Sequence, residues 1–242
     1  MISIDDLQFG CELEFYVNQM IEEELIEELE QISNKNLILN NKDGQNDDSK
    51  MNYKRDASLH GENGKEITTP ICSYEKLKEY ILKICKLISS NAQTNGDTGF
   101  HIHISTIDDS LSVDFYRFML LSNNNESLLS NWGDRNKFSL NVMDILDVLD
   151  FEEARKFKNK KGRIWSLEKR NNNHIEIRTI GGAGYEKKAE LILSELDKFI
   201  EIFLICLQKP DKNYLTILKE HMLKLQNTPK EKRDKFLEII NK

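Results

Sequence analysis

The sequence predicts an α+β protein in which a largely antiparallel sheet is covered on one face by helices. Three observations lead to this fold class. Several short segments alternate apolar and polar residues, as half-buried strands do, and longer segments carry apolar residues at helical spacing. The two kinds of segment are interspersed without the regular alternation of a doubly wound parallel sheet. We therefore expect the second face of the sheet to be available for a ligand.

The first elements follow from short-range patterns. Residues 7–17 (LQFGCELEFYV) alternate in strand fashion, and residues 20–32 have the apolar spacing of an exposed, acidic, amphipathic helix. The polar, turn-rich residues 40–50 predict a loop. Two short strands joined by the turn HGENG are expected next, in MNYKRDASL and GKEITTPI.

The rest of the chain is predicted to be mostly helical. Ser73 is the expected N-cap of a helix over residues 74–89, and TGFHIHIS (98–105) is the next strand. Before residue 210 we expect helices over 114–129, 144–157 and 185–207, and strands in GRIWSL and NHIEIRTI. Two more helices follow Pro210, the second with the capping box TPKE. The expected organisation is a main domain over residues 1–209 and a helical extension over residues 210–242 that packs on it.

Composition excludes several classes of protein. The chain has 242 residues, a formal net charge of −7 and four dispersed cysteines without a C-x-x-C pair. The charge argues against nucleic acid or an anionic membrane as a partner, and the cysteines indicate buried thiols in a reducing compartment. No segment approaches the roughly 18 apolar residues that span a bilayer, and the acidic N-terminus is unlike a signal peptide. We expect a cytoplasmic protein, either a monomer or a homo-oligomer.

Two predicted strands place chemically active side chains on one face. In TGFHIHIS, His101 and His103 alternate with apolar residues, so both imidazoles point to the same side. In FGCELEF, Glu12 and Glu14 share one face and the apolar residues take the other. An E-x-E pair alone is most often a solvated face, and an H-x-H pair is structural or incidental about as often as functional.

Two further strands repeat the pattern. Glu176 and Arg178 share a face of HIEIRTI, and Glu66 lies beside an apolar neighbour in GKEITTPI. An E-x-R pair alone is most often a surface salt bridge. Carboxylates from several strands that converge in one hollow repel each other, and divalent cations remove this repulsion. Carboxylate and imidazole ligands suit Mg²⁺ or Mn²⁺, whereas the absence of a histidine triad or cysteine cluster argues against zinc.

Four motifs occur in the order and approximate spacing seen in a known family: FGCELEFY, RDASLHGENGKEITTPI, TGFHIHIS and HIEIRTIGG. Over residues 7–184 the chain resembles the amidoligase family, which belongs to the carboxylate–amine ligase superfamily of glutamine synthetase and glutamate–cysteine ligase. The family pattern is a G-x-E-x-E strand, an Asp-Gly-Ser-like turn before G-x-E-I-x-x-P, a G-x-H-x-H strand and a late E-F-R strand. Two positions depart from it, because Ala57 replaces the usual glycine and Ile177 replaces the phenylalanine.

The resemblance implies a glutamine synthetase-like catalytic domain over residues 1–209. Its curved, mainly antiparallel sheet would carry helices on the convex face, and ATP with two or three Mg²⁺ or Mn²⁺ ions on the concave face. A substrate carboxylate would attack the γ-phosphate to form an acyl phosphate, and an amine would then displace phosphate to form an amide. The implied partners are small-molecule or peptide carboxylates and amines.

The resemblance also implies five metal ligands. Glu12 and Glu14 would each bind a different ion, and Glu66 would join Glu14. His101 would be a ligand alongside Glu12 and Glu176.

Other implied roles concern the nucleotide and the substrates. His103 would lie near the phosphates, and Arg178 would stabilise charge on the transferring γ-phosphoryl group. Asp56 would hold the substrate amine or a metal-bound water, so that Asp56, Glu66 and Arg178 form the expected catalytic set. Arg163 is a candidate nucleotide contact in a segment that lacks the expected asparagine.

Two alternative functions use the same residue types. A two-metal hydrolase of phosphate esters or phosphodiesters also needs carboxylates and histidines, and a non-catalytic nucleotide or peptide sensor would keep the same scaffold. The six cations of residues 155–163 form either a solvated loop or a phosphate lid over ATP. His60 and His174 flank the site in sequence, and a structural role is favoured for each.

Overall fold

The sheet is built around β1, an eleven-residue strand that spans Leu7–Val17. The computed structural model describes residues 2–40, 47–61, 63–123 and 167–209, together with Trp132 and Thr216. Within these residues the strands follow the order β2-β3-β4-β1-β6-β8-β7, and β5 pairs with one end of β1. The other strands are β2 (Leu37–Asn40), β3 (Met51–Arg55), β4 (Gly64–Thr68), β5 (Ala92–Gln93), β6 (Gly99–Thr106), β7 (Leu167–Asn171) and β8 (His174–Gly181). All pairs are antiparallel except β2 with β3, so the predicted α+β class with a mostly antiparallel sheet is confirmed.

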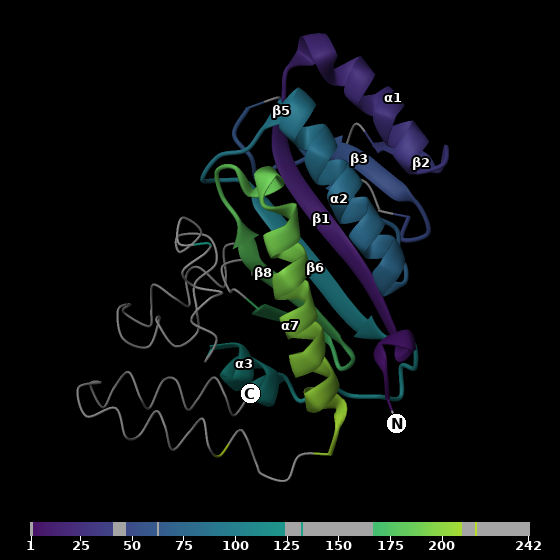
Figure 1. Ribbon diagram of the computed structural model, residues 1–242, viewed down its shortest axis with the longest axis vertical. Coiled ribbons are helices and arrows are strands. Elements are labelled where there is room, and N and C mark those ends of the chain that lie inside the picture. The colour runs from purple at the N-terminus through teal and green to yellow at the C-terminus, as the bar shows by residue number, and fades with distance from the viewer. Residues whose placement is uncertain are drawn as a thin grey trace, which may run out of the picture.

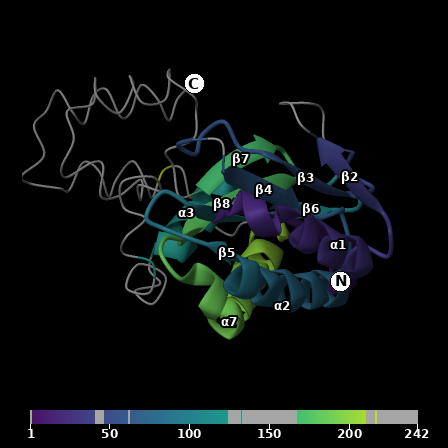
Figure 2. The ribbon, with the colours of Figure 1, turned by 90° about the horizontal axis from the view of Figure 1, so that it is seen from above.

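Helices cover one side of this sheet. They are α1 (Glu22–Ile32), α2 (Tyr74–Asn91), α3 (Phe115–Asn123) and α7 (Ala189–Leu207), and short 3₁₀ turns span Ile4–Asp6, Gln19–Ile21 and Tyr185–Lys187. Figure 1 shows α2 and α7 in front of β1, β6 and β8, and Figure 2 shows α1, α2 and α7 on the same side of the strands. The expected layer of helices on one face is present.

Alternation along β1 decides which face the helices cover. Phe9, Cys11, Leu13 and Phe15 are at most 1% exposed and belong to the core that α2 and α7 complete. The helix α2 contributes a stripe of buried residues at 3- and 4-residue spacing: Leu77, Tyr80, Ile81, Ile84, Cys85 and Ile88. Its predicted N-cap is also correct, because the Ser73 side chain accepts a hydrogen bond from the Lys76 backbone N–H.

The 3₁₀ turn that precedes α7 is tied to the middle of the sheet. The Tyr185 hydroxyl is buried and donates to the Glu14 carbonyl at 2.8 Å, and its ring packs edge-on against Phe100. Further along α7, Phe199 stacks on Phe118 of α3 with ring centroids 6.2 Å apart. This long apolar helix therefore supports the core from the strand layer out to α3, as the sequence predicts.

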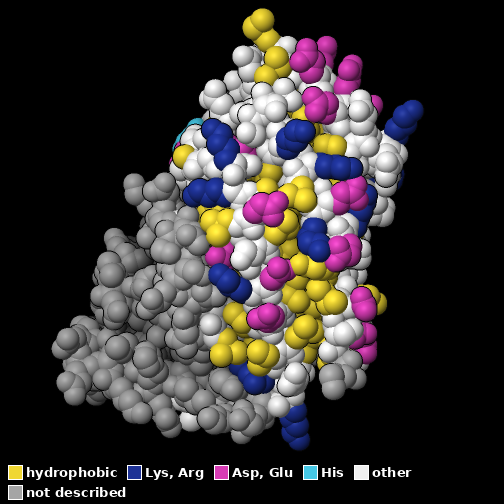
Figure 3. All heavy atoms as spheres, in the orientation of Figure 1, with side chains coloured by type: hydrophobic (Ala, Val, Ile, Leu, Met, Phe, Trp, Pro, Cys, Tyr) yellow, Lys and Arg dark blue, Asp and Glu magenta, His cyan; other side chains and the backbone are white. Residues whose placement is uncertain are grey.

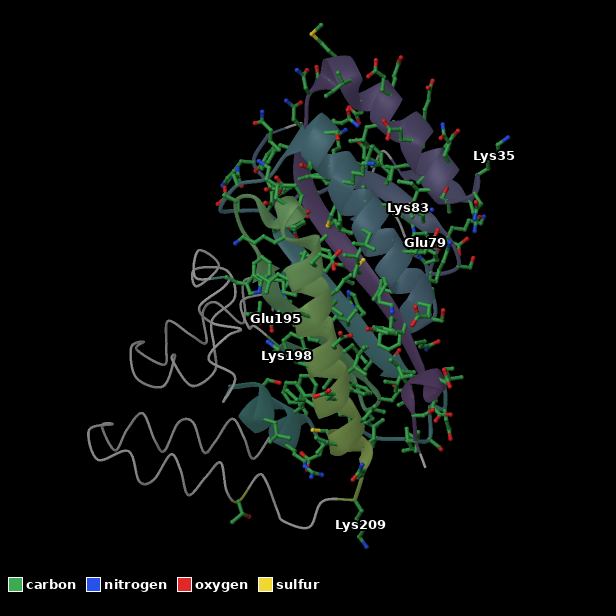
Figure 4. All side chains as sticks on the ribbon, viewed as in Figure 1. Lys35, Glu79, Lys83, Glu195, Lys198 and Lys209 are labelled. Atoms are coloured by element: carbon green, nitrogen blue, oxygen red, sulfur yellow. The ribbon has the colours of Figure 1, made fainter. Side chains whose placement is uncertain are left out.

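The outer face of the helices is solvated. Glu79 and Lys83 lie one turn apart on α2 with Oε1 and Nζ 2.6 Å apart, and on α7 the exposed Lys198 pairs with Glu195, which is itself buried (Figure 4). Figure 3 shows this face as a mixture of charged and hydrophobic side chains. None of the helices in the described part of the chain has the length and apolar character needed to span a bilayer.

Three strands differ from expectation. The short apolar run of β2 does not alternate, and its parallel pairing with β3 depends on a remote partner, so no local pattern marks it. The two-residue β5 is too short to leave a pattern. Strand β7 begins at Leu167, where the predicted strand of residues 162–167 ends, and its charged sequence LEKRN is typical of an edge strand.

Several predictions fall outside the described residues. These are the helix over 144–157, most of the strand over 162–167, the last part of the helix over 114–129 and, apart from Thr216, the extension over 210–242.

Candidate metal centre

Strand register brings the sequence motifs onto one face. Residues that are directly opposite in an antiparallel pair point to the same side, with Cα atoms about 4.5–5.5 Å apart. Three such pairs join the motifs: Glu12 with His101, Glu14 with Glu66, and His103 with Glu176. Because the apolar neighbours of these residues face the helices, the pairs occupy the opposite face of the sheet.

Arg178 joins this group on the face of Glu176, and a β-bulge follows it directly. The β6–β8 register shifts between Phe100 and Ile102, so that two residues of β8, Arg178 and Thr179, lie across from His101. The extra residue returns Ile180 to the core, where it is fully buried. Without the bulge, strict alternation would place Ile180 on the polar face.

Three side chains form a group that could hold one metal ion. Glu12, His101 and Glu176 each offer a ligand atom, and these atoms lie within 4.8 Å of one another. His101 Nδ1 is 2.9 Å from Glu12 Oε2 and 3.7 Å from Glu176 Oε1. Ligands at about 2.1 Å from a Mg²⁺ ion lie about 3 Å apart at right angles and about 4.2 Å apart when opposite. Small side-chain adjustments would therefore place all three around one ion.

The second nitrogen of His101 provides an independent indication of a cation. The side chain is 2% exposed, and Nε2 has no hydrogen-bond partner among the described residues. Its nearest charged neighbour is Glu14 Oε1, at 3.7 Å. When Nδ1 donates to Glu12, Nε2 of the neutral ring carries a lone pair that faces a carboxylate oxygen. Either a second proton on the ring or a cation between the two atoms removes this repulsion, so the residues fit a metal ion.

Two carboxyl groups of the cluster have lowered pKa values. Burial alone would raise the pKa of Glu12, but hydrogen bonds from His101 and His103 and the charges of the two rings outweigh it and hold the pKa well below its ordinary value. Burial also opposes ionisation of Glu176, which is fully buried. The positive charges of His101, His103 and Arg178 outweigh that effect and lower the Glu176 pKa. Both groups therefore remain anionic at neutral pH.

Glu66 shows the opposite behaviour. Burial, followed by the charge of Glu12 and more weakly that of Asp56, raises its pKa to about 7, although Lys54 lowers it. Lys54 Nζ lies 3.1 Å from Glu66 Oε1, which also accepts a hydrogen bond from the Thr68 hydroxyl at 2.9 Å. A proton or a metal ion at this carboxyl relieves the same repulsion.

Arg178 lies inside the cluster. Its Nη1 donates to Glu176 Oε1 at 2.5 Å and is 3.3 Å from His101 Nδ1. The guanidinium group is buried, and it partly balances the carboxylates without any bound ion. Its permanent charge suits it to an anionic ligand that enters the site.

The remaining predicted residues lie around this centre or outside the described residues. Glu14 is buried, and its Oε2 accepts the Gly99 N–H at 2.6 Å. Asp56 is also buried, and one of its oxygens accepts both the N–H and the hydroxyl of Ser58, so it organises the turn. Arg163 and the basic residues 155–163 lie outside the described residues.

Sequence reasoning missed or undervalued two contacts. Lys54 faces Glu66 across the β3–β4 pair, and only the register reveals this, since a lysine near a strand end is usually solvated. His174 Nε2 is 3.0 Å from His103 Nδ1, so His174 lies against the site instead of only flanking it in sequence. His60 is exposed, and its backbone N–H donates to the Tyr16 hydroxyl.

Comparison with models of known protein families gives no match, and comparison with curated proteins gives no significant relative. The resemblance to amidoligases therefore rests on the four motifs.

Proposed function

We propose that the chain is an ATP-dependent carboxylate–amine ligase that works with Mg²⁺ or Mn²⁺. The observation that carries this proposal is the meeting of Glu12, His101 and Glu176 from three neighbouring strands, with ligand atoms within 4.8 Å. Glu14, Glu66 and Arg178, from the same four motifs, surround this group on the same face. These are residues to which the sequence resemblance assigns metal-binding or phosphate-binding roles.

The proposed roles follow from the position of each side chain. Glu12, His101 and Glu176 would hold one ion, and Glu14 with Glu66 would hold another. When bound, the metal ions neutralise charge on the phosphates of ATP. The substrate carboxylate would attack the γ-phosphorus and release ADP, and an amine would then attack the acyl carbon and release phosphate.

The chain itself supplies positioning and charge. Arg178 is the buried guanidinium nearest to the proposed ligands, and it would bind oxygens of the transferring phosphoryl group in a bidentate manner. His103 lies beside Glu12, with Nε2 and Oε1 3.4 Å apart, at the border of the group where phosphates would enter. Asp56 lies in the turn before β4 and would hold a metal-bound water.

The test is release of ADP from Mg·ATP by the full chain, screened against carboxylates and amines in pairs. A ligase requires both substrates, and product mass should equal their sum less one water. Glu12→Gln should abolish turnover, whereas Glu75→Gln, an exposed acid on α2, should not. Cleavage of a generic phosphodiester without ATP would support a two-metal hydrolase instead. Binding of Mg·ATP without turnover for any pair would support a sensor.

A further inference from the structure

A groove adjoins the candidate metal centre. Its volume is about 320 Å³, and it borders Glu12 and His103 at one end. This volume is at the lower end of the range of about 300–1,000 Å³ for small-molecule sites. The groove therefore suits one compact co-substrate better than a nucleotide.

Gly10 makes the floor of the groove open. It lies between Gln8 and Glu12 on β1, directly opposite His103 in the β1–β6 register. A Cβ atom at this position would come no closer than 3.8 Å to another heavy atom, the Thr69 hydroxyl oxygen. Backbone strain does not require a glycine here, so the missing side chain leaves space above the strand.

The walls of the groove are acidic and are fixed in place. Asp109 lies on one wall, where the buried Asn173 donates to its Oδ1 at 2.9 Å. Asp48 lines the groove as well, in a loop held by the Ile71 N–H, which donates to the Asp48 carbonyl at 2.8 Å. Both aspartates are exposed. With Glu12 at the metal end, three carboxylates border one small cavity.

No described residue of the groove lining carries a permanent positive charge. Among the described residues that line it, none is lysine or arginine, and the remaining polar groups are amides, hydroxyls and the two imidazoles. The three carboxylates of the lining outnumber its two imidazoles, so an anionic occupant such as a triphosphate or a carboxylate would meet an excess of negative charge there. A cationic occupant with several N–H donors would find acceptors along its whole length.

We propose that this groove binds the amine co-substrate, and that this co-substrate is an aliphatic primary amine, as in a diamine or a lysine side chain, that binds as the cation and loses a proton to solvent before its nitrogen attacks the acyl carbon. That the bound amine is a co-substrate rests on the proposed function. That the occupant is a cationic amine rests on the volume of the groove and on the residues that line it. The inference assigns the amine to the Gln8–Glu12 side of the metal centre, and so separates it from the anionic substrates that Arg178 attracts.

The experiment measures binding without turnover. The full chain is titrated with 1,5-diaminopentane and, as a neutral control of equal length, with 1,5-pentanediol, in a chelator-containing buffer without ATP, by ligand-detected NMR. The diamine should bind at least about tenfold more tightly than the diol, because charge-assisted hydrogen bonds to carboxylates are lost in the diol. Raising the salt concentration should weaken the binding of the diamine alone.

Variants locate the binding site. Asp48→Asn and Asp109→Asn should each weaken diamine binding several-fold, and Gly10→Val should weaken it by filling the floor without changing charge. Glu75→Gln, which removes one exposed carboxylate from α2, is the matched control and should change nothing. The thermal unfolding midpoint of each variant verifies that it is folded.

The outcomes separate this inference from the proposed function. Equal affinity for diamine and diol, or diamine affinity unchanged in Asp48→Asn and Asp109→Asn, overturns the groove assignment even if ATP-dependent ligation is found. Diamine binding that depends on both aspartates, without any ligation, supports the groove and overturns the ligase.

Discussion

His101 lies directly opposite Glu12 in the β1–β6 register, and its Nδ1 is 2.9 Å from Glu12 Oε2. Without a bound ion, this contact occupies one ring nitrogen and leaves Nε2 facing Glu14 across 3.7 Å. A metal ion held by Glu12, His101 and Glu176 would replace the proton between Nδ1 and Oε2, because metal ligands bind in their deprotonated form. Three predictions follow from this arrangement and from the surrounding cluster, and a fourth follows from the burial of the cysteines.

Mn²⁺ should bind to the chain and raise its thermal unfolding midpoint, because an ion that binds only the folded state stabilises it. Glu12→Gln and Glu176→Gln should each weaken binding by at least about tenfold, since each removes an anionic ligand. Calorimetric titration with Mn²⁺ measures the affinity. Glu75→Gln is the control, and unchanged affinity in both site variants would refute the assignment of the centre.

The ionisation of Glu66 should make the stability of the chelator-treated protein depend on pH. Because its pKa rises from about 4.5 unfolded to about 7 folded, the folded state binds more protons between these values, and stability falls as pH rises through that window. The loss attributable to Glu66 is at most about 3 kcal/mol. Glu12 and Glu176 have lowered pKa values, so their contributions are lost only at more acidic pH.

The free energy of unfolding is measured with urea for the wild type and for Glu66→Gln, at several pH values between 5 and 8 in the presence of chelator. The difference between the two proteins separates the contribution of Glu66 from that of the histidines. The variant should lose less stability than the wild type over the window. Parallel pH profiles would contradict the expectation.

Arg178→Met should destabilise the metal-free protein. The substitution leaves the fully buried Glu176 carboxylate without its 2.5 Å partner, and loss of one partner of a buried ion pair typically costs about 3–5 kcal/mol. The double variant Glu176→Gln/Arg178→Met should recover part of that loss. Denaturant unfolding of the four proteins of the cycle gives the coupling, and strictly additive effects would show that the pair is not coupled.

The four cysteines should be unreactive in the folded chain at pH 8. Burial raises the pKa of Cys85 and Cys206 to about 12 and that of Cys72 to about 11, and it raises the pKa of Cys11 well above its ordinary value. Because the thiolate is the reactive form, a disulfide reagent should modify them only slowly until denaturant is added. Cys72 is the only partly exposed thiol and should react first; fast reaction of several thiols would contradict this.

Local sequence patterns predict which face of the sheet a side chain takes, but they do not predict which side chains meet at the site. Alternation in β1 and β6 predicts which side Glu12 and His101 take, because side-chain direction has a strict period of two. Their actual contact depends on register between strands about 90 residues apart, which no local pattern contains. The same applies to Lys54 beside Glu66 and to His174 beside His103, since each pair is joined only by pairing of strands.

Edge strands and a bulge account for the other differences between the predicted and the observed sheet. The β2 strand is an apolar run that pairs in parallel, and β7 is a charged edge, so neither has the alternation that predicts a half-buried strand. The bulge across from His101 likewise places Ile180 in the core opposite Phe100. It depends on the pairing of β8 with β6, which the local sequence of β8 does not contain.

That bulge makes β8 one residue longer than the stretch of β6 it accompanies. Removal of Thr179 would place Ile180 directly after Arg178, and strict alternation would then keep the guanidinium group on the polar face and the isoleucine in the core. The bulge is therefore a position where β8 could lose a residue without exchanging the faces of its neighbours, whereas a deletion in the regularly paired part of the strand would exchange them.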